Sequence, residues 1–323
     1  MANGTQVRNG KAFEYALAKA YYDYVTNAGV RAELVENEPL KQNKAAYEAC
    51  DESEQNRFVL TSRATIDSMI KLEPGIMAQR GAADKLLIYM QSDQQGVEGD
   101  VRDIVLKRMN PTWEIGFSAK NNHEAVKHSR LSSTNDFGDK WLGVPCSDTY
   151  WHEIKPVFQY IREHRELGHT WKDLGKDKVS KVYVPLLNAF KKELLFINEN
   201  NDNIPEKLIR YLIGEYSFYK IIKDDAHNLV VVKAFNLKGE LNKTVSGVKA
   251  RYKTPRLALP TRIVEFEYKE KSGSQDTLDM IMDGGWEISF RIHSADNPMP
   301  ESLKFDIQLL GNPPILFTQH LFQ

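Results

Sequence analysis

The sequence of 323 residues has few cysteines and no long apolar run. Its two cysteines, Cys50 and Cys146, are far apart and form no Cys-x-x-Cys pair, so free thiols in a reducing compartment are expected. No segment approaches the roughly 18–20 apolar residues that are needed to cross a bilayer. The polar start, MANGTQVRNG, does not have the pattern of a signal peptide. Together these absences predict a soluble, cytoplasmic protein with no membrane contact.

Several catalytic motifs are also absent. There is no P-loop, which argues against ATP-driven chemistry, and HEIKP at 152–156 lacks the second histidine of a zinc-protease helix. No glycine-rich dinucleotide fingerprint follows a predicted strand. The formal net charge is −1, so there is no global cationic field. A nucleic-acid partner would therefore need a local basic surface.

The composition and the apolar periodicity predict a folded α/β protein. Hydrophobic residues make up 41% of the chain and charged residues 27%, which is enough to bury a core. Helical spacing indicates helices over 11–25, 61–72, 151–167 (with a break near Pro156), 185–198 and 204–213, whereas 85–90, 103–108, 113–120 and four segments after 226 resemble strands. We expect a mixed central sheet flanked by helices, with a core at 1–220 and a strand-rich part at 221–323.

The stretch GDVRDIVLKRMNPTWEIGFSAK, residues 99–120, predicts a hairpin with one polar face. An Asn-Pro turn at 110–111 separates two strand-like segments. Because side chains alternate along a strand, Glu114, Ser118 and Lys120 share a face, and the apolar residues between them form the other. Asp103 begins the neighbouring strand, where its carboxylate could lie near this polar face.

Two carboxylates beside a lysine suit the hydrolysis of phosphodiesters. Carboxylates bind Mg²⁺, which can activate a water and neutralise charge on the phosphate. A nearby lysine can orient that water or stabilise the developing charge. We therefore predict Asp103 and Glu114 as Mg²⁺ ligands, Asp100 as an alternative ligand, Ser118 as a residue that lines the site, and Lys120 as the catalytic lysine. An ordinary hairpin with surface ion pairs is the other interpretation.

Two more acidic residues have both a structural and a functional interpretation. Glu14 lies near the start of the first predicted helix, where it could complete the metal site or could be a solvated residue of that helix. Asp84 precedes a predicted strand and could belong to the site, although a turn is the favoured interpretation.

Two segments are candidates for DNA contact. The first directly follows Lys120 and is predicted to form a helix over 123–131, on which His123 and Lys127 would share a face. Its hydrogen-bonding side chains suit phosphate and base-edge contacts: Asn121, Asn122, His123, Lys127, His128 and Arg130. The second is the basic stretch 233–256, in which Lys249, Arg251 and Lys253 are predicted to bind DNA. Ordinary solvated surfaces are the alternative for both.

These motifs carry a family resemblance. An acidic residue that begins one strand, followed by (D/E)-x-K on the next, resembles the PD-(D/E)XK nuclease superfamily. Ser118 replaces the acidic residue of that motif, and Arg102 stands where a proline would precede Asp103. The segments GDVRDIVL, WEIGFSAKNNHEAVKHSRLS, DFGDKW and GWEISFRIH resemble the HaeIII-like type II restriction endonucleases.

The resemblance implies a function and a set of partners. It implies Mg²⁺-dependent cleavage of double-stranded DNA at a short GC-rich palindrome, with GGCC expected, and a role for 221–323 in DNA recognition. A cognate DNA methyltransferase is an expected partner. If the site is palindromic, a two-fold homodimer would match its symmetry, and a monomer that acts twice is the alternative. A structure-specific or repair nuclease on the same scaffold, or a non-catalytic DNA-binding protein, remain as alternatives.

Overall fold

The chain forms two compact units that alternate along the sequence. The computed structural model describes residues 2–79, 81, 83–92, 99–109, 112–122, 125–269, 275–293 and 299–322. Unit 1 comprises residues 1–124, 214–257 and 315–323, and unit 2 comprises residues 125–213 and 258–314. The sequence predicted one division near residue 220. The chain instead leaves unit 1 twice and returns to it twice, because strands distant in sequence pair within each unit.

Unit 1 contains a mixed sheet of seven strands in the order β1-β2-β3-β4-β6-β7-β12. The pairs β1–β2 and β4–β6 are parallel and the others are antiparallel, which confirms the predicted mixed sheet. The strands are β1 (Ala32–Leu34), β2 (Leu86–Met90), β3 (Ile104–Met109), β4 (Thr112–Asn121), β6 (Phe218–Asp224), β7 (Leu229–Phe235) and β12 (Thr318–Phe322).

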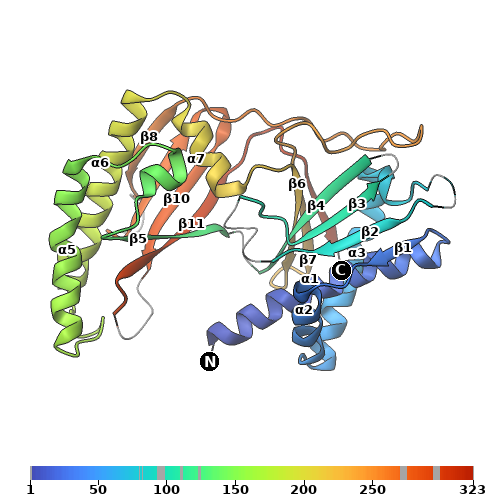
Figure 1. The fold of residues 1–323 in the computed structure, drawn as a ribbon, viewed down its shortest axis with the longest axis horizontal. Coiled ribbons are helices and arrows are strands. Elements are labelled where there is room, and N and C mark those ends of the chain that lie inside the picture. The colour runs from blue at the N-terminus through green and yellow to red at the C-terminus, as the bar shows by residue number, and fades with distance from the viewer. Residues whose placement is uncertain are drawn as a thin grey trace. The chain divides into compact units, whose positions relative to one another are not determined.

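Three helices cover one face of this sheet (Figure 1). They are α1 (Ala2–Asn27), α2 (Glu38–Glu48) and α3 (Glu52–Leu72), and a 3-10 turn follows at Pro74–Ile76. The helix predicted from residue 61 begins earlier, because Asp51 caps α3 and forms a capping box with Glu54. On the covered face, Tyr21 of α1 stacks on Phe117 of β4 with ring centroids 5.1 Å apart. The core of unit 1 therefore lies between the helices and the sheet.

Unit 2 contains an antiparallel sheet of five strands in the order β5-β11-β10-β9-β8. The strands are β5 (Ala125–Ser132), β8 (Ile263–Tyr268), β9 (Thr277–Met282), β10 (Glu287–His293) and β11 (Ser302–Gly311). The helices are α5 (Asp148–Glu166), α6 (Val184–Asn200) and α7 (Ile204–Ile213), with π-helical turns at Gly138–Leu142 and Lys178–Tyr183 and a 3-10 turn at Asp283–Gly285.

Helix α6 packs on one face of the five-stranded sheet. Phe190 of α6 contacts the rings of Phe266, Phe290 and Phe305, at centroid distances of 5.0–6.1 Å. Helix α5 lies beside α6 on the same side of these strands (Figure 1). The break predicted near Pro156 is wrong, because α5 continues through this proline.

The helix predicted over 123–131 is also wrong. Residues 125–132 form strand β5, which pairs with β11 in the register Arg130↔Lys304 and Ser132↔Ser302. Ser129 and Leu131 are buried, while Arg130 between them is exposed, which is the alternation of a strand. The pairing partner lies 170 or more residues away in sequence, so local spacing could not reveal it. Lys127 therefore lies on a strand and not on a helix, whereas His123 is outside the described residues.

Two further predictions concern the cysteines and the membrane. Cys50 and Cys146 are both free, as expected, and both are buried. Within the residues that the structure describes, no helix is both long and apolar enough to span a bilayer.

Candidate active site

The hairpin predicted over 103–120 is confirmed. Strands β3 and β4 are antiparallel neighbours with Val105 opposite Gly116 and Lys107 opposite Glu114. Phe117 and Ala119 belong to the core beneath the helices. Side chains alternate along β4, so Glu114, Gly116, Ser118 and Lys120 lie on the face that these helices do not cover.

Asp103 and Lys120 meet at the end of this face. The backbone N–H of Ala119 donates to Asp103 Oδ2 at 2.7 Å, and Lys120 Nζ lies 3.5 Å from the same oxygen. The backbone N–H of Asp103 donates to the carbonyl of Phe117, which fixes its position beside β4. Both side chains are about one-fifth exposed. A carboxylate and an ammonium thus lie together within reach of solvent.

Two buried lysines continue this polar face across the sheet. Lys220 of β6 pairs in register with Ser118, and Lys233 of β7 pairs with Lys220. All three side chains are buried. Sequence reasoning did not single out Lys220, although a lysine that alternates with apolar residues in FYKIIKD is a signal that could have indicated it. The structure places two further cations on the face that carries Lys120.

Glu114 and Asp100 are held by Arg102. Arg102 Nη1 donates to Glu114 Oε1 at 2.7 Å, and Nε and Nη2 donate to the two carboxylate oxygens of Asp100 at 2.7 Å each. Lys107 Nζ lies 3.6 Å from Glu114 Oε2. The guanidinium also lies over the ring of Tyr216, 4.2 Å from its centroid. We call these groups the Arg102 clamp: Asp100, Arg102 and Glu114.

The clamp has a clear electrostatic consequence for Asp100. Burial opposes ionisation of this carboxyl, but hydrogen bonds from Arg102 and Gln91 outweigh that effect and hold its pKa below the usual value. Asp100 is therefore a carboxylate that already has a cation bound in bidentate geometry. Any metal would have to compete with Arg102 for both Asp100 and Glu114.

Two of the predicted site residues carry donors that fit Mg²⁺. Asp103 supplies a carboxylate and Ser118 a hydroxyl, and both are the hard oxygen donors that Mg²⁺ takes. Magnesium is often held by one or two protein carboxylates together with substrate phosphates, so Asp103 beside Lys120 fits this ion. Among the described residues, no three His, Cys, Asp or Glu side chains gather as a potential metal site, so Asp100, Asp103 and Glu114 do not form such a group.

The structure gives Glu14 and Asp84 different surroundings. Glu14 Oε2 accepts a hydrogen bond of 2.7 Å from Asn43 Nδ2 of α2. Asp84 is buried and forms an ion pair of 3.2 Å with Arg108, whose side chain is completely buried. Arg108 also donates to the carbonyls of Gly75 and Ile76. Asp84 therefore belongs to a buried ion pair within unit 1.

The polar residues after Lys120 are only partly described. Asn122 has a φ of 61° and exchanges hydrogen bonds with Asp225, so its amide fixes the β6–β7 turn. Arg130 of β5 is exposed and donates to Ser302 Oγ at 2.7 Å. Asn121 lies at the end of β4 and is half-buried. His123 and the side chains of Lys127 and His128 lie outside the described residues.

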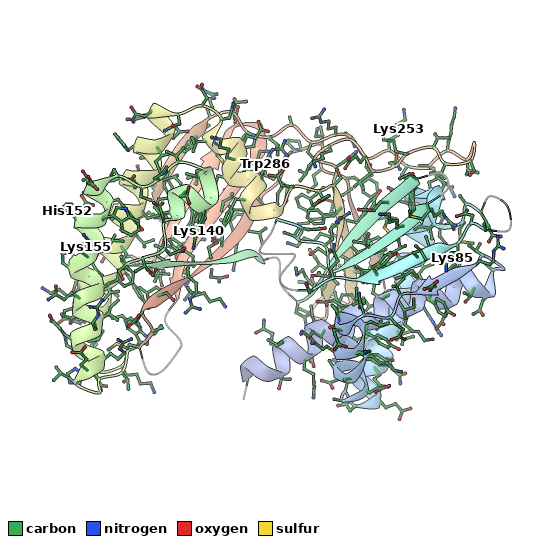
Figure 2. The ribbon with its side chains drawn as sticks, viewed as in Figure 1. Lys85, Lys140, His152, Lys155, Lys253 and Trp286 are labelled. Atoms are coloured by element: carbon green, nitrogen blue, oxygen red, sulfur yellow. The ribbon has the colours of Figure 1, made fainter. Side chains whose placement is uncertain are left out.

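The basic loop, residues 236–257, projects exposed cations from unit 1. Its base is fixed because Asn236 donates to the Thr254 carbonyl and Asn242 donates to Glu73 and to the Leu72 carbonyl. Its exposed cations are Lys238, Lys243, Lys249, Arg251, Lys253 and Arg256. Lys253 lies away from the strands of the sheet (Figure 2). A fixed loop with this charge is suited to bind a polyanion.

A hairpin that brings an aspartate and a lysine together on the sheet face opposite α1–α3, in the unit that also carries the basic loop, is an arrangement suited to a nuclease, and comparison with known proteins agrees. The family model described as "HaeIII restriction endonuclease" matches residues 10–313 of this chain. The chain therefore belongs to the HaeIII restriction endonuclease family, whose members are site-specific deoxyribonucleases.

One curated relative gives the particular protein that the chain resembles. The chain is 36% identical over 312 residues to the type II restriction enzyme HaeIII of Haemophilus aegyptius. The matched region covers 94% of each of the two chains. No solved structure is significantly similar to this chain. The family and the mixed α/β fold expected from the sequence are thus confirmed.

Proposed function

We propose that this protein is a Mg²⁺-dependent type II restriction endonuclease that cleaves both strands of DNA at a short GC-rich palindrome, with GGCC as the expected site. The observation that carries the proposal is the contact between Asp103 and Lys120 on the face of β4 opposite α1–α3. The family membership supports DNA as the substrate and a site-specific cut as the reaction.

The residues of this face have distinct proposed roles. Asp103 would hold Mg²⁺ together with the substrate phosphate, and Ser118 would line the site. The bound ion supplies Lewis-acid chemistry that lowers the pKa of water and neutralises phosphate charge. Lys120 Nζ, which lies 3.5 Å from Asp103, would orient the attacking water and stabilise charge as the phosphodiester is cleaved.

Glu114 and Asp100 have a different proposed role. Both were predicted as metal ligands, but each accepts hydrogen bonds from Arg102. We propose that they fix the segment before β3, which begins at Ile104, and so position Asp103 indirectly. On this basis Glu114→Ala weakens cleavage less than Asp103→Asn does.

Further contacts and partners belong to the same proposal. Lys249, Arg251 and Lys253 of the basic loop would hold DNA phosphates, and Asn121, His123, Lys127, His128 and Arg130 remain proposed DNA contacts. Asn122 would act through the turn that it fixes with Asp225. A two-fold homodimer would match a palindromic site, and a cognate methyltransferase would protect the host DNA at that site.

Digestion of unmethylated plasmid DNA with Mg²⁺ tests the proposal. We expect discrete fragments from the wild type, no fragments with Lys120→Ala or Asp103→Asn, and reduced yield with Glu114→Ala. Sequencing the fragment ends would give the site. A smear, or cuts only at branched or damaged DNA, would indicate a repair nuclease on the same scaffold. DNA that stays intact under all divalent metals while still being bound would indicate a non-catalytic binding protein.

A further inference from the structure

The open face of the five-stranded sheet in unit 2 carries a row of polar side chains. The opposite face packs on α6 through Phe290 and Phe305. Residues that alternate with these phenylalanines point the other way, and they include Ser289, Arg291, Lys304, Asp306 and Gln308. This open face, centred on β10 and β11, is polar along its length.

A hollow of about 320 Å³ lies on this open face. Its lining includes Arg291, Asp306, Ser289, Gln308 and Asp276. Arg291 and Asp306 are directly opposite each other on β10 and β11. The hollow therefore has Arg291 and Asp306 side by side, with Lys269, Asp276 and neutral hydrogen-bonding groups in the rest of its lining.

Among the described residues, Arg291 and Asp306 make only long contacts in the hollow, whereas Thr277 Oγ1 donates to Asp276 Oδ1 at 2.7 Å. Arg291 Nε lies 3.6 Å from Asp276 Oδ2, and the Arg291 side chain is 53% exposed. Gln308 Nε2 lies 3.4 Å from Asp306 Oδ2. On the neighbouring strand β9, Asp279 shares this face with Ser289, and among the described residues Asp279 Oδ1 has no hydrogen-bond partner. Projecting groups that are weakly engaged in the protein can exchange these contacts for a ligand at low cost.

We infer that this face reads base edges in the substrate DNA, with Arg291 bound to guanine and Asp306 to cytosine. Arginine donates two parallel hydrogen bonds to guanine O6 and N7, and a carboxylate accepts from the cytosine amino group. An Arg and an Asp held side by side thus match the two bases of a G·C pair. The inference deepens the proposed function, because it names residues that would select a GC-rich site.

The spacing and the connectivity of the strands support this assignment. Alternate residues on a strand are separated by about 6.8 Å, which matches two base-pair steps of about 3.4 Å. Ser289 and Arg291 are alternate residues of this kind. Strand β5, an edge strand of the same sheet, begins five residues after Lys120 in the sequence, and its Arg130 pairs in register with Lys304. The mixture of donors and acceptors suits base edges better than phosphates alone, which would require only cations.

Selection of bound sequences from a random DNA library tests the inference. The parent protein is the full chain with Lys120→Ala, which is expected to bind DNA without cutting it. It is compared with three variants that each add one further change: Arg291→Ala, Arg291→Lys or Asp306→Ala. We expect Arg291→Lys to keep its overall affinity for DNA, because the charge remains. Its preference for guanine at one position should fall by about ten- to hundredfold. Asp306→Ala should relax the preference for cytosine. Lys155→Ala, on the exposed side of α5 (Figure 2), is the control and should change nothing.

The outcomes separate this inference from the proposed function. If the wild type cuts a defined site and both Arg291 variants select the same sequences as the parent, the inference is wrong and the proposed function stands. If the wild type produces no discrete fragments, the proposed function itself fails. A change in oligomeric mass on sedimentation, without a change in selected sequence, would assign this face to contact with a second copy and would also overturn the inference.

Discussion

Arg102 lies across β4 at Gly116, because residue 116 has no side chain. A Cβ at this position would lie 2.0 Å from Arg102 Cδ and 2.6 Å from its Cγ. The glycine thereby lets a buried guanidinium reach both Asp100 and Glu114. Gly116 lies opposite Val105 on β3, so the clamp passes directly over the candidate catalytic hairpin.

Gly116→Ala is expected to break the Arg102 clamp. The added methyl group must displace the arginine stem, and we expect a loss of about 1–3 kcal/mol in the free energy of unfolding. In an Arg102→Ala background the same change should cost much less, because the clash is gone. Urea denaturation of the four proteins of this double-mutant cycle measures the difference. Equal costs in both backgrounds would show that the two residues are not coupled.

The buried pair of Arg108 and Asp84 should contribute to stability and not to chemistry. Asp84→Ala leaves a completely buried guanidinium without its carboxylate, and we expect a loss of about 3–5 kcal/mol in the free energy of unfolding. Lys107→Met on the same strand is the control and should cost less than about 1 kcal/mol, because its ion pair with Glu114 is partly exposed. Cleavage per folded molecule at low temperature should be retained by Asp84→Ala. A loss of activity without a loss of stability would indicate that Asp84 belongs to the active site.

Glu73 should make stability depend on pH. Burial raises its pKa from about 4.5 to about 7, although hydrogen bonds from Tyr219 and the backbone N–H of Asn242 favour the charged form. Between these two values the folded state keeps a proton that the unfolded state has released. This contribution to stability is therefore complete below about pH 4.5 and is lost as the pH rises to about 7, by an amount on the order of 3 kcal/mol.

Glu73→Gln tests this linkage because it keeps an oxygen acceptor and removes the titration. The free energy of unfolding is measured from pH 4.5 to pH 8 for both proteins. The free energy of unfolding of the wild type minus that of the variant should fall with rising pH and level off above about pH 7. Glu48→Gln, on an exposed part of α2, is the control for general charge effects. Curves for wild type and Glu73→Gln that stay parallel would rule out titration of Glu73 in this range.

The basic loop should govern the salt dependence of DNA binding. Each phosphate contact contributes about 0.9 to the slope of log K against log salt concentration. We expect the triple change Lys249→Ala, Arg251→Ala and Lys253→Ala to lower this slope by up to about 3 and to weaken binding uniformly across sequences. Lys85→Ala, an exposed lysine that pairs with Glu33, is the control. An unchanged slope in the triple variant would show that these three residues of the basic loop do not contact DNA phosphates.

Much of unit 1 could be predicted from the sequence, because its signals are local. Gly29, with a φ of +81°, follows the end of α1, and strand β2 lies where the apolar run KLLIYM predicted it. Alternation and the Asn-Pro pair in the sequence predicted the hairpin of β3 and β4, and the pairing of these strands confirms it. Such features depend on neighbours within a few residues, which is the information that periodicity contains.

The position of each carboxylate could not be predicted, because it depends on packing between segments. Asp103 and Glu114 were both assigned to the metal from their face of the hairpin. Arg102 holds Glu114, while Asp103 meets Lys120, and only the register of the two strands and the space above Gly116 decide this. Asp84 looked like a turn residue, but its partner Arg108 on β3 makes it part of a buried ion pair.

By itself the sequence determined the family, the mixed α/β character and the face of β4 that carries Ser118 and Lys120. Tertiary structure alone decided that 125–132 is a strand, because its partner β11 is far away in the sequence and pairing overrides local helical spacing. It also decided that Lys220 and Lys233 join the polar face, and that Arg291 stands beside Asp306. Hydrogen bonding between distant strands brings these side chains together, and no local pattern records it.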